Sequence, residues 1–262
     1  MTTPTLAALA APRGGVAQAR GGPTPERAAP IRWVSFDLDG TLLDTVLDLH
    51  AACAGMLADL GRPPLSVAEI RAGVGRGMAV LVARCLDGEG STDPELLARG
   101  IERFRHHYRR ENGLQASFFP GVREGLDAFR AMGLPLAVVT NKPFEFTEQL
   151  LERTGLAPYF VCAFGGDSLP EKKPHPAQIL ATSKKIGLTP PEGLHIGDSR
   201  HDFEAAHAAG CRYWHVPYGY GEGAGSQPVA AKECDALVSS LADAAERVRR
   251  INQNLPTTAA NA

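Results

Sequence analysis

The chain reads Ile31-Arg32-Trp33-Val34-Ser35-Phe36-Asp37-Leu38-Asp39-Gly40-Thr41 where an apolar run meets two closely spaced aspartates. The apolar part predicts a buried strand that ends before Gly40. Because alternate side chains of a strand share one face, Asp37 and Asp39 are predicted to point into one cleft. Two carboxylates held together either share a proton or bind a cation. Taken alone, the stretch is explained equally well by an ordinary Asp-Gly turn.

From residue 31 onward, strand-like apolar runs alternate with helical patterns, and a glycine follows each of these helices. The expected strands are Trp33–Leu38, Pro135–Thr140, Tyr159–Phe164, Leu194–Ile196, Tyr213–Val216 and Ala236–Val238. The expected helices between them are Val122–Met132, Phe144–Thr154, Pro176–Ile186 and Asp202–Ala209. Such alternation predicts an α/β fold with a parallel sheet and crossover helices.

Residues 47–113 interrupt this alternation. They carry no strand signal and predict three helices, Asp48–Leu60, Val67–Leu86 and Pro94–Glu111. A helical insert after the first strand would lie over the carboxyl ends of the strands, where open sheets bind ligands, so it is a candidate lid. A purely structural subdomain is the alternative. Thr45 and Asp48 are expected to cap the first insert helix.

A glycine-rich stretch, Gly73-Val74-Gly75-Arg76-Gly77, lies inside the predicted insert. Glycine destabilises a helix, so this stretch is predicted to dip toward the crevice. One hypothesis is that Arg76 contacts a carboxylate of the substrate. The alternative is a simple loop between helices.

Composition limits the class of protein. The 262 residues carry 27 basic and 29 acidic side chains, a net charge of −2, which favours neither a nucleic-acid partner nor a membrane surface. Five scattered cysteines without a C-x-x-C pair indicate a reduced, cytoplasmic protein with buried thiols. Residues 1–30 are expected to be a disordered leader and residues 253–262 a flexible tail. A monomer and a homodimer remain open.

Four polar clusters follow predicted strands. They are Asp37-Leu38-Asp39-Gly40-Thr41, Thr140-Asn141-Lys142, Lys172-Lys173-Pro174-His175-Pro176 and Gly197-Asp198-Ser199-Arg200-His201-Asp202. In a doubly wound sheet the carboxyl ends of the strands converge on one crevice, so these clusters are predicted to meet there.

The residue types in these clusters indicate phosphoryl chemistry. The oxygens of Asp37, Asp39 and Asp198 suit a hard cation such as Mg²⁺. Donors suited to phosphoryl oxygens come from a second set, namely Thr140, Asn141 and Lys173, with the backbone N–H groups of Gly40 and Thr41. Neither a serine–histidine nor a cysteine–histidine pair is suggested, which leaves a carboxylate as the candidate nucleophile. The expected partner is a small phosphorylated metabolite.

The order of these motifs resembles the haloacid dehalogenase superfamily of phosphohydrolases. The resemblance covers about residues 31–250 and implies a Rossmann-like core, residues 31–46 and 114–252, with a helical C1 cap at 47–113. It implies that Asp37 attacks phosphorus and that Asp39 is the general acid and base. It also implies that Asp37, Asp198 and the backbone carbonyl of Asp39 bind Mg²⁺. Asp202 would support the metal site or orient Lys173.

Several further segments resemble the bacterial phosphoglycolate phosphatase family, among them Thr140-Asn141-Lys142 and Gly165-Gly166-Asp167-Ser168-Leu169-Pro170. This resemblance implies hydrolysis of 2-phosphoglycolate to glycolate and phosphate. The alternatives within the superfamily are a sugar phosphate, such as N-acetylmuramate 6-phosphate, or pyrophosphate, with a mutase less favoured. A phospholigand-binding protein without catalysis is the alternative from another class. Dehalogenation is disfavoured because Asp198 and Asp202 indicate a cation that carbon–halogen cleavage does not need.

Overall fold

The computed structural model describes residues 30–87, 93–221 and 229–254. Its centre is a six-stranded sheet in the order β5-β4-β1-β6-β7-β8, in which every neighbouring pair is parallel. The strands are β1 (Trp33–Phe36), β4 (Leu136–Val139), β5 (Cys162–Phe164), β6 (Gly193–Gly197), β7 (Arg212–His215) and β8 (Ala236–Leu237). The predicted α/β class with a parallel sheet is therefore confirmed.

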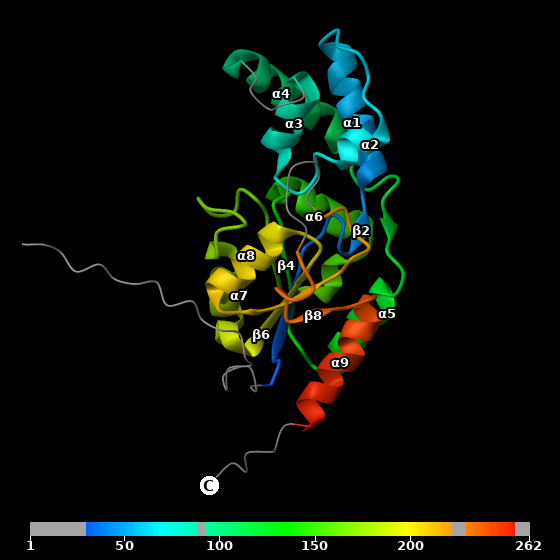
Figure 1. Ribbon diagram of the computed structural model, residues 1–262. Helices are drawn as coiled ribbons and strands as arrows, with labels where there is room; N and C mark the ends of the chain where they lie inside the picture. The colour runs from blue at the N-terminus through cyan, green and yellow to red at the C-terminus, as the bar shows by residue number, and fades with distance from the viewer. Residues whose placement is uncertain (1–29, 88–92, 222–228, 255–262) are drawn as a thin grey trace, which may run out of the picture.

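Helices cover both faces of this sheet (Figure 1). The helices are α5 (Val122–Ala131), α6 (Phe144–Arg153), α7 (Ala177–Ile186), α8 (Arg200–Ala209) and α9 (Leu241–Asn254). Val34 and Phe36 of β1 pack in one apolar cluster with side chains of α5 and α9. Trp33 packs in another with side chains of α7 and α8. Alternate residues of β1 thus belong to opposite layers, as the period of a strand requires.

The insert forms a group of helices above the strand ends (Figure 1). These helices are α1 (Val46–Asp59), α2 (Val67–Arg71), α3 (Met78–Asp87) and α4 (Pro94–Glu111). They share an apolar cluster of their own, which includes Met56, Leu81 and Phe104. The predicted single helix Val67–Leu86 is wrong: the chain leaves helical geometry between α2 and α3. Gly75 and Gly77 there have φ of 107° and 91°, which side chains with a Cβ rarely adopt.

Two short connections join the insert to the core. β2 (Leu43–Asp44) enters the insert and pairs antiparallel with β3 (Ser117–Phe118), which leaves it. The buried Asp48 carboxylate accepts hydrogen bonds from the backbone N–H groups of Gly113, at 2.8 Å, and Gln115, at 2.7 Å. Asp48 therefore ties the first turn of α1 to the returning connection and does not cap the helix, contrary to expectation.

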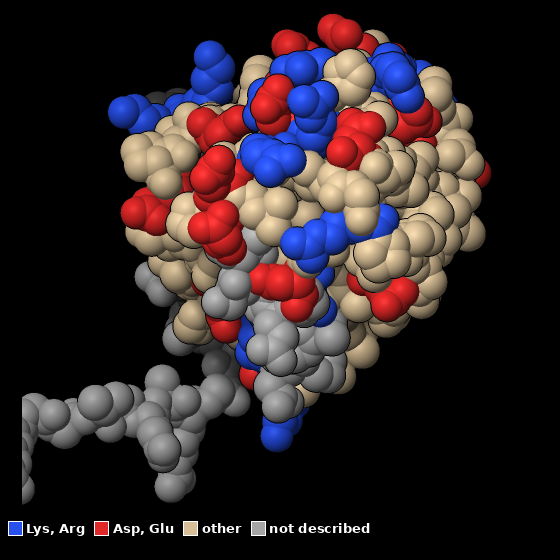
Figure 2. Space-filling model, turned by 90° about the horizontal axis from the view of Figure 1, so that it is seen from above, with Lys and Arg blue, Asp and Glu red and all other residues tan. Residues whose placement is uncertain are grey.

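The end of the molecule above the strands, seen in Figure 2, carries acidic and basic side chains interspersed with one another. Among the described residues, no helix has the length and apolar character needed to cross a membrane. The predicted leader, apart from residue 30, and residues 255–262 of the predicted tail lie outside the described residues.

Candidate active site

The carboxyl ends of β1 and β6 bring together acidic groups that are far apart in the chain. Asp37 follows β1, Asp198 follows β6, and Asp202 lies in the first turn of α8. All three are buried, and one oxygen of each lies within 4.8 Å of the others. The predicted convergence of Asp37 with Asp198 is therefore seen in the structure.

Lys173, from the loop between β5 and α7, lies against this cluster. Its buried ammonium group is 2.9 Å from Asp37 Oδ1 and donates to Asp202 Oδ1 at 2.5 Å. Burial alone would lower the pKa of Lys173, but the charges of Asp202 and Asp37 outweigh it and raise that pKa. Lys173 is therefore a fixed cation beside Asp37.

A chain of hydrogen bonds holds Asp202 in place. Its Oδ1 also contacts His195 Nε2 at 3.1 Å, and the other ring nitrogen of His195 is 2.9 Å from the Ser35 hydroxyl. Burial would raise the pKa of Asp202, but Lys173 and His195 hold it well below its usual range. Ser199 contributes both its N–H and its hydroxyl to Asp202 Oδ2. Both oxygens of Asp202 are therefore held by hydrogen bonds, one of them from Lys173.

Asp198 is positioned by two loops. Thr41 donates its hydroxyl to Oδ1 at 3.0 Å, and the N–H groups of Tyr220 and Gly221 donate to Oδ2 at 2.7 and 3.1 Å. Gly219 is required beside it, because a Cβ there would lie 2.3 Å from the Cβ of Asp198 and 2.4 Å from the carbonyl oxygen of Gly40. Asp198 is thus held in one position at the carboxyl end of β6.

The protonation behaviour of these carboxylates fits a cation site. Burial raises the pKa of Asp37 to about 6, with Lys173 opposing this and Asp202 adding to it. Burial and the charge of Asp37 raise the pKa of Asp198 well above its usual range. Crowded, dehydrated carboxylates are destabilised until a positive charge joins them, and an all-oxygen donor set suits a hard divalent ion. Asp37 and Asp198 therefore fit a metal ion held between them.

Asp39 points to a different set of partners. Thr45 donates its hydroxyl to Asp39 Oδ1 at 2.6 Å, and the Lys142 ammonium lies 3.1 and 3.2 Å from the two carboxylate oxygens. Lys142 also donates to the hydroxyl group of Tyr108, which comes from α4 of the insert. The expectation that the Thr45 side chain caps α1 is wrong, because its hydroxyl is directed to Asp39 instead.

The other predicted phosphate ligands are distributed around this centre. Thr140 is buried at the end of β4, and the Asn141 amide donates to the carbonyl oxygens of Gly75 and Lys173, both at 3.0 Å. The N–H groups of Gly40 and Thr41 are hydrogen-bonded within their own turn. Direct contacts of Asn141, Gly40 and Thr41 with phosphate therefore stay predictions.

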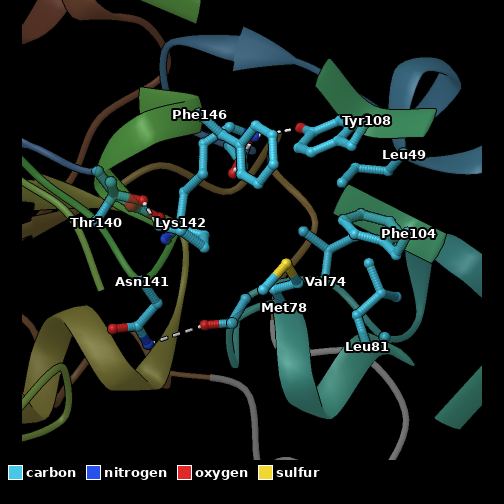
Figure 3. A pocket seen from close by; sticks show the side chains of 16 residues that line it. Leu49, Val74, Met78, Leu81, Phe104, Tyr108, Thr140, Asn141, Lys142 and Phe146 are labelled. Atoms are coloured by element: carbon cyan, nitrogen blue, oxygen red, sulfur yellow. Dashed lines mark hydrogen bonds and ion pairs between the residues drawn. The ribbon is translucent and has the colours of Figure 1, made fainter. Parts of the chain in front are cut away.

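A pocket extends from these carboxylates toward the insert (Figure 3). Its lining combines Asp37, Asp39, Thr140 and Lys142 of the core with mostly apolar insert residues, namely Leu49, Gly73, Val74, Gly75, Gly77, Met78, Leu81, Phe104 and Tyr108. The glycine-rich stretch thus reaches the crevice. Arg76 is not among the lining residues. Its substrate contact stays a prediction.

Four residues at the site were not singled out from the sequence. Lys142 stands in the sequence as part of the Thr140-Asn141-Lys142 motif, and no sequence pattern assigns a role to His195, Tyr108 or Tyr220. A histidine in the middle of the apolar strand β6 was a signal, because a buried imidazole needs polar partners. Tyr108 carried no such signal, since its position depends on how the insert lies over the core.

A glycine-specific prediction follows from the packing around Asp198. We expect Gly219→Ala to displace Asp198 and raise the divalent-metal concentration needed for half-maximal activity at least about tenfold. Gly187→Ala is the control, because its Cβ would meet no atom within 4 Å and only backbone strain is added. Metal titrations of both variants check this. Equal metal dependence in the two variants would show that the close approach at Gly219 is unimportant.

Comparison with known proteins identifies the class to which this fold and site belong. Residues 34–216 match the family model described as haloacid dehalogenase-like hydrolase. The chain therefore belongs to the haloacid dehalogenase-like hydrolase family and is an enzyme. The resemblance inferred from its four motifs is confirmed.

Individual relatives are more specific. A phosphoglycolate phosphatase of Thiobacillus denitrificans is 46% identical over 223 residues, which cover 84% of this chain and 97% of that protein. A phosphoglycolate phosphatase of Nitrosospira multiformis is 42% identical over 223 residues, which cover 84% of this chain and 97% of that protein. Among solved structures, a predicted phosphoglycolate phosphatase from Haemophilus somnus has a TM-score of 0.76 at 33% identity. The match covers 83% of this chain and 97% of the chain in that structure.

Proposed function

We propose that this enzyme is a Mg²⁺-dependent phosphatase that hydrolyses 2-phosphoglycolate to glycolate and phosphate through an aspartyl-phosphate intermediate. The observation that carries this proposal is the arrangement of Asp37, Asp198 and Lys173. A carboxylate with a raised pKa lies beside a second one and 2.9 Å from a buried ammonium group. The names of the relatives support the choice of substrate.

The residues divide the reaction between two sides of the site. Asp37 attacks phosphorus while Lys173 and Thr140 hold phosphoryl oxygens, and the bond from phosphorus to the ester oxygen breaks. Asp39 gives its proton to the leaving alkoxide, then takes a proton from the water that cleaves the phosphoaspartate. Asp37, Asp198 and the backbone carbonyl of Asp39 would hold Mg²⁺, and the ion would supply positive charge that offsets the charge of the phosphoryl oxygens.

Asp202 and His195 contribute by orientation. Lys173 is held between two carboxylates, so it cannot swing away when the phosphoryl group arrives. Asp202 in turn cannot move because Ser199 and His195 occupy its oxygens. This preorganisation is the kind that stabilises a charged transition state without a cost at the moment of reaction.

Phosphate release from a panel of substrates tests the proposal. We expect release from 2-phosphoglycolate to exceed that from N-acetylmuramate 6-phosphate and pyrophosphate by at least about a hundredfold in kcat/KM. EDTA should abolish it and Mg²⁺ should restore it, because the carboxylate pair otherwise repels the substrate anion. A sugar phosphate or pyrophosphate as the better substrate would overturn the assignment. Binding of these phosphates without any release would indicate a phospholigand-binding protein.

The remaining proposals concern the protein's setting. The partner is a small phosphorylated metabolite, the location is the cytoplasm, and the protein is a monomer or a homodimer. Contact of Arg76 with the substrate carboxylate stays a hypothesis from the sequence, since Arg76 does not line the pocket.

A further inference from the structure

The pocket beyond Asp39 carries a charge that the hydrolytic steps do not use. Among its described lining residues, three are charged: Asp37, Asp39 and Lys142. Lys142 is therefore the positive charge of this pocket. It is only 6% exposed, and apolar insert residues such as Leu49 and Phe104, which are 5% and 1% exposed, form the opposite wall. A cation in such surroundings faces Asp39 and also attracts a second small anionic group that enters the pocket.

The position of Lys142 relative to Asp39 sets what it can reach. Its Nζ lies 3.1 and 3.2 Å from the two oxygens of Asp39, the proposed proton donor to the leaving oxygen. A leaving oxygen that hydrogen-bonds Asp39 therefore lies next to the ammonium group. In a phosphorylated 2-hydroxy acid only one carbon separates that oxygen from the carboxylate. The carboxylate thus falls within hydrogen-bonding range of Lys142.

Tyr108 completes a pair of donors. Lys142 donates to the Tyr108 oxygen, so the phenolic hydrogen is free of this bond and can point toward another acceptor (Figure 3). Burial raises the pKa of Tyr108 well above its usual range, so the phenol keeps this hydrogen. An ammonium and a phenol side by side suit the two oxygens of a carboxylate. Because Tyr108 belongs to α4, this pair joins the core to the insert.

We propose that Lys142 and Tyr108 form the recognition site for the carboxylate of the substrate's leaving group, and so select phosphorylated 2-hydroxy acids over neutral phosphate esters. This inference rests on the proposed function and names the groups that set its specificity. Lys173 is paired with two carboxylates, Asp37 and Asp202, whereas Lys142 is paired with one, that of Asp39. Arg76 does not line the pocket. Among the described residues that line the pocket, Lys142 is the cation that can bind the carboxylate of the leaving group.

The test compares two esters that differ only in charge at this position, 2-phosphoglycolate and the phosphate ester of glycolamide. The measured quantity is the ratio of their kcat/KM values. We expect Lys142→Met to lower this ratio about thirtyfold, because a charge-assisted hydrogen bond to the carboxylate is lost. Tyr108→Phe should lower it severalfold, and Lys142→Arg should restore much of it. Most of the loss should appear in KM.

The ratio of the two kcat/KM values distinguishes recognition of the substrate carboxylate by Lys142 from positioning of Asp39 by Lys142. If Lys142 only orients Asp39, Lys142→Met slows both esters equally and the ratio stays constant, which overturns the proposal. A ratio lost in Arg76→Ala but kept in Lys142→Met also overturns it. Lys184→Met, on the exposed face of α7, is the control for a change of net charge and should keep the wild-type ratio. If Lys142→Met does not fold, the ratios of kcat/KM measured for Tyr108→Phe and Lys142→Arg test the proposal instead.

Failure of the proposed function gives a different result. A wild-type enzyme that releases no phosphate from 2-phosphoglycolate refutes the assignment of the substrate, and the proposal falls with it. A wild-type enzyme that hydrolyses both esters with a ratio near one keeps the phosphatase assignment and refutes only the carboxylate site.

Discussion

Asp37→Asn should abolish phosphate release, with kcat lowered by about 10⁴-fold or more. An amide oxygen is a poor nucleophile and a weaker ligand for a divalent ion, so the substitution removes both contributions of this side chain. Continuous phosphate detection at saturating 2-phosphoglycolate and Mg²⁺ checks this expectation. Residual activity above about one-hundredth of the wild-type value would show that another group attacks phosphorus.

The same variant should remain folded. Asparagine has nearly the shape of aspartate, and Lys173 keeps the buried carboxylate of Asp202 as its counter-charge when residue 37 is neutral. We therefore expect circular dichroism and Tm in EDTA to match those of the wild type within a few degrees. Loss of the fold would mean that inactivity does not report on catalysis.

Lys173→Met should have the second large effect, on both activity and stability. Lys173 is 2% exposed and pairs with two buried carboxylates, so its removal leaves Asp37 and Asp202 facing each other without a counter-charge. Breaking a buried ion pair in this way costs about 3–5 kcal/mol of unfolding free energy. We also expect kcat/KM to fall about 10³-fold, because a fixed donor to the phosphoryl group is lost.

Urea denaturation in EDTA measures the stability of this variant without help from a bound cation. Lys172→Met is the matched control, since the same substitution is made one residue away at a half-buried side chain. It should change the unfolding free energy by less than about 1 kcal/mol. Equal destabilisation by the two substitutions would contradict a special role for the Lys173 ion pairs.

The sheet was predictable because its inner strands are buried on both faces. All residues of β1, β4 and β6 are buried and most of them are apolar, and such runs are distinctive in a sequence. The helix α9 was missed, although Leu241, Ala244, Ala245 and Val248 recur at helical spacing and are buried against the core. The pattern was present, but the weakly apolar alanines concealed it.

The convergence of polar residues at the candidate site was predictable for a different reason. Parallel strands all end at one edge, so polar residues directly after β1, β4 and β6 had to meet there. What could not be inferred was how the side chains divide between the two faces of the site. Asp39 pairs with Lys142, whereas Asp37 pairs with Lys173, and this division depends on the turn at Gly40 and on the position of α4. Neither is encoded in local spacing.

The insert was the least predictable part. Helical periodicity continues through Val67–Leu86, and only the glycines at 73, 75 and 77 showed where the chain turns. The role of Asp48 depended on the returning connection at Gly113 and Gln115, which is distant in the sequence. Hydrogen bonds of this range leave no local signal.

Chemical trapping of the covalent intermediate tests the assignment of Asp37 most directly. Enzyme quenched in acid during turnover of 2-phosphoglycolate with Mg²⁺ can be reduced with borohydride, which converts an aspartyl phosphate to homoserine. We predict that peptide mass spectrometry finds homoserine at position 37 and that Asp37→Asn shows none. Rapid turnover with an unmodified residue 37, or with the modification at position 39 or 198, would contradict the mechanism.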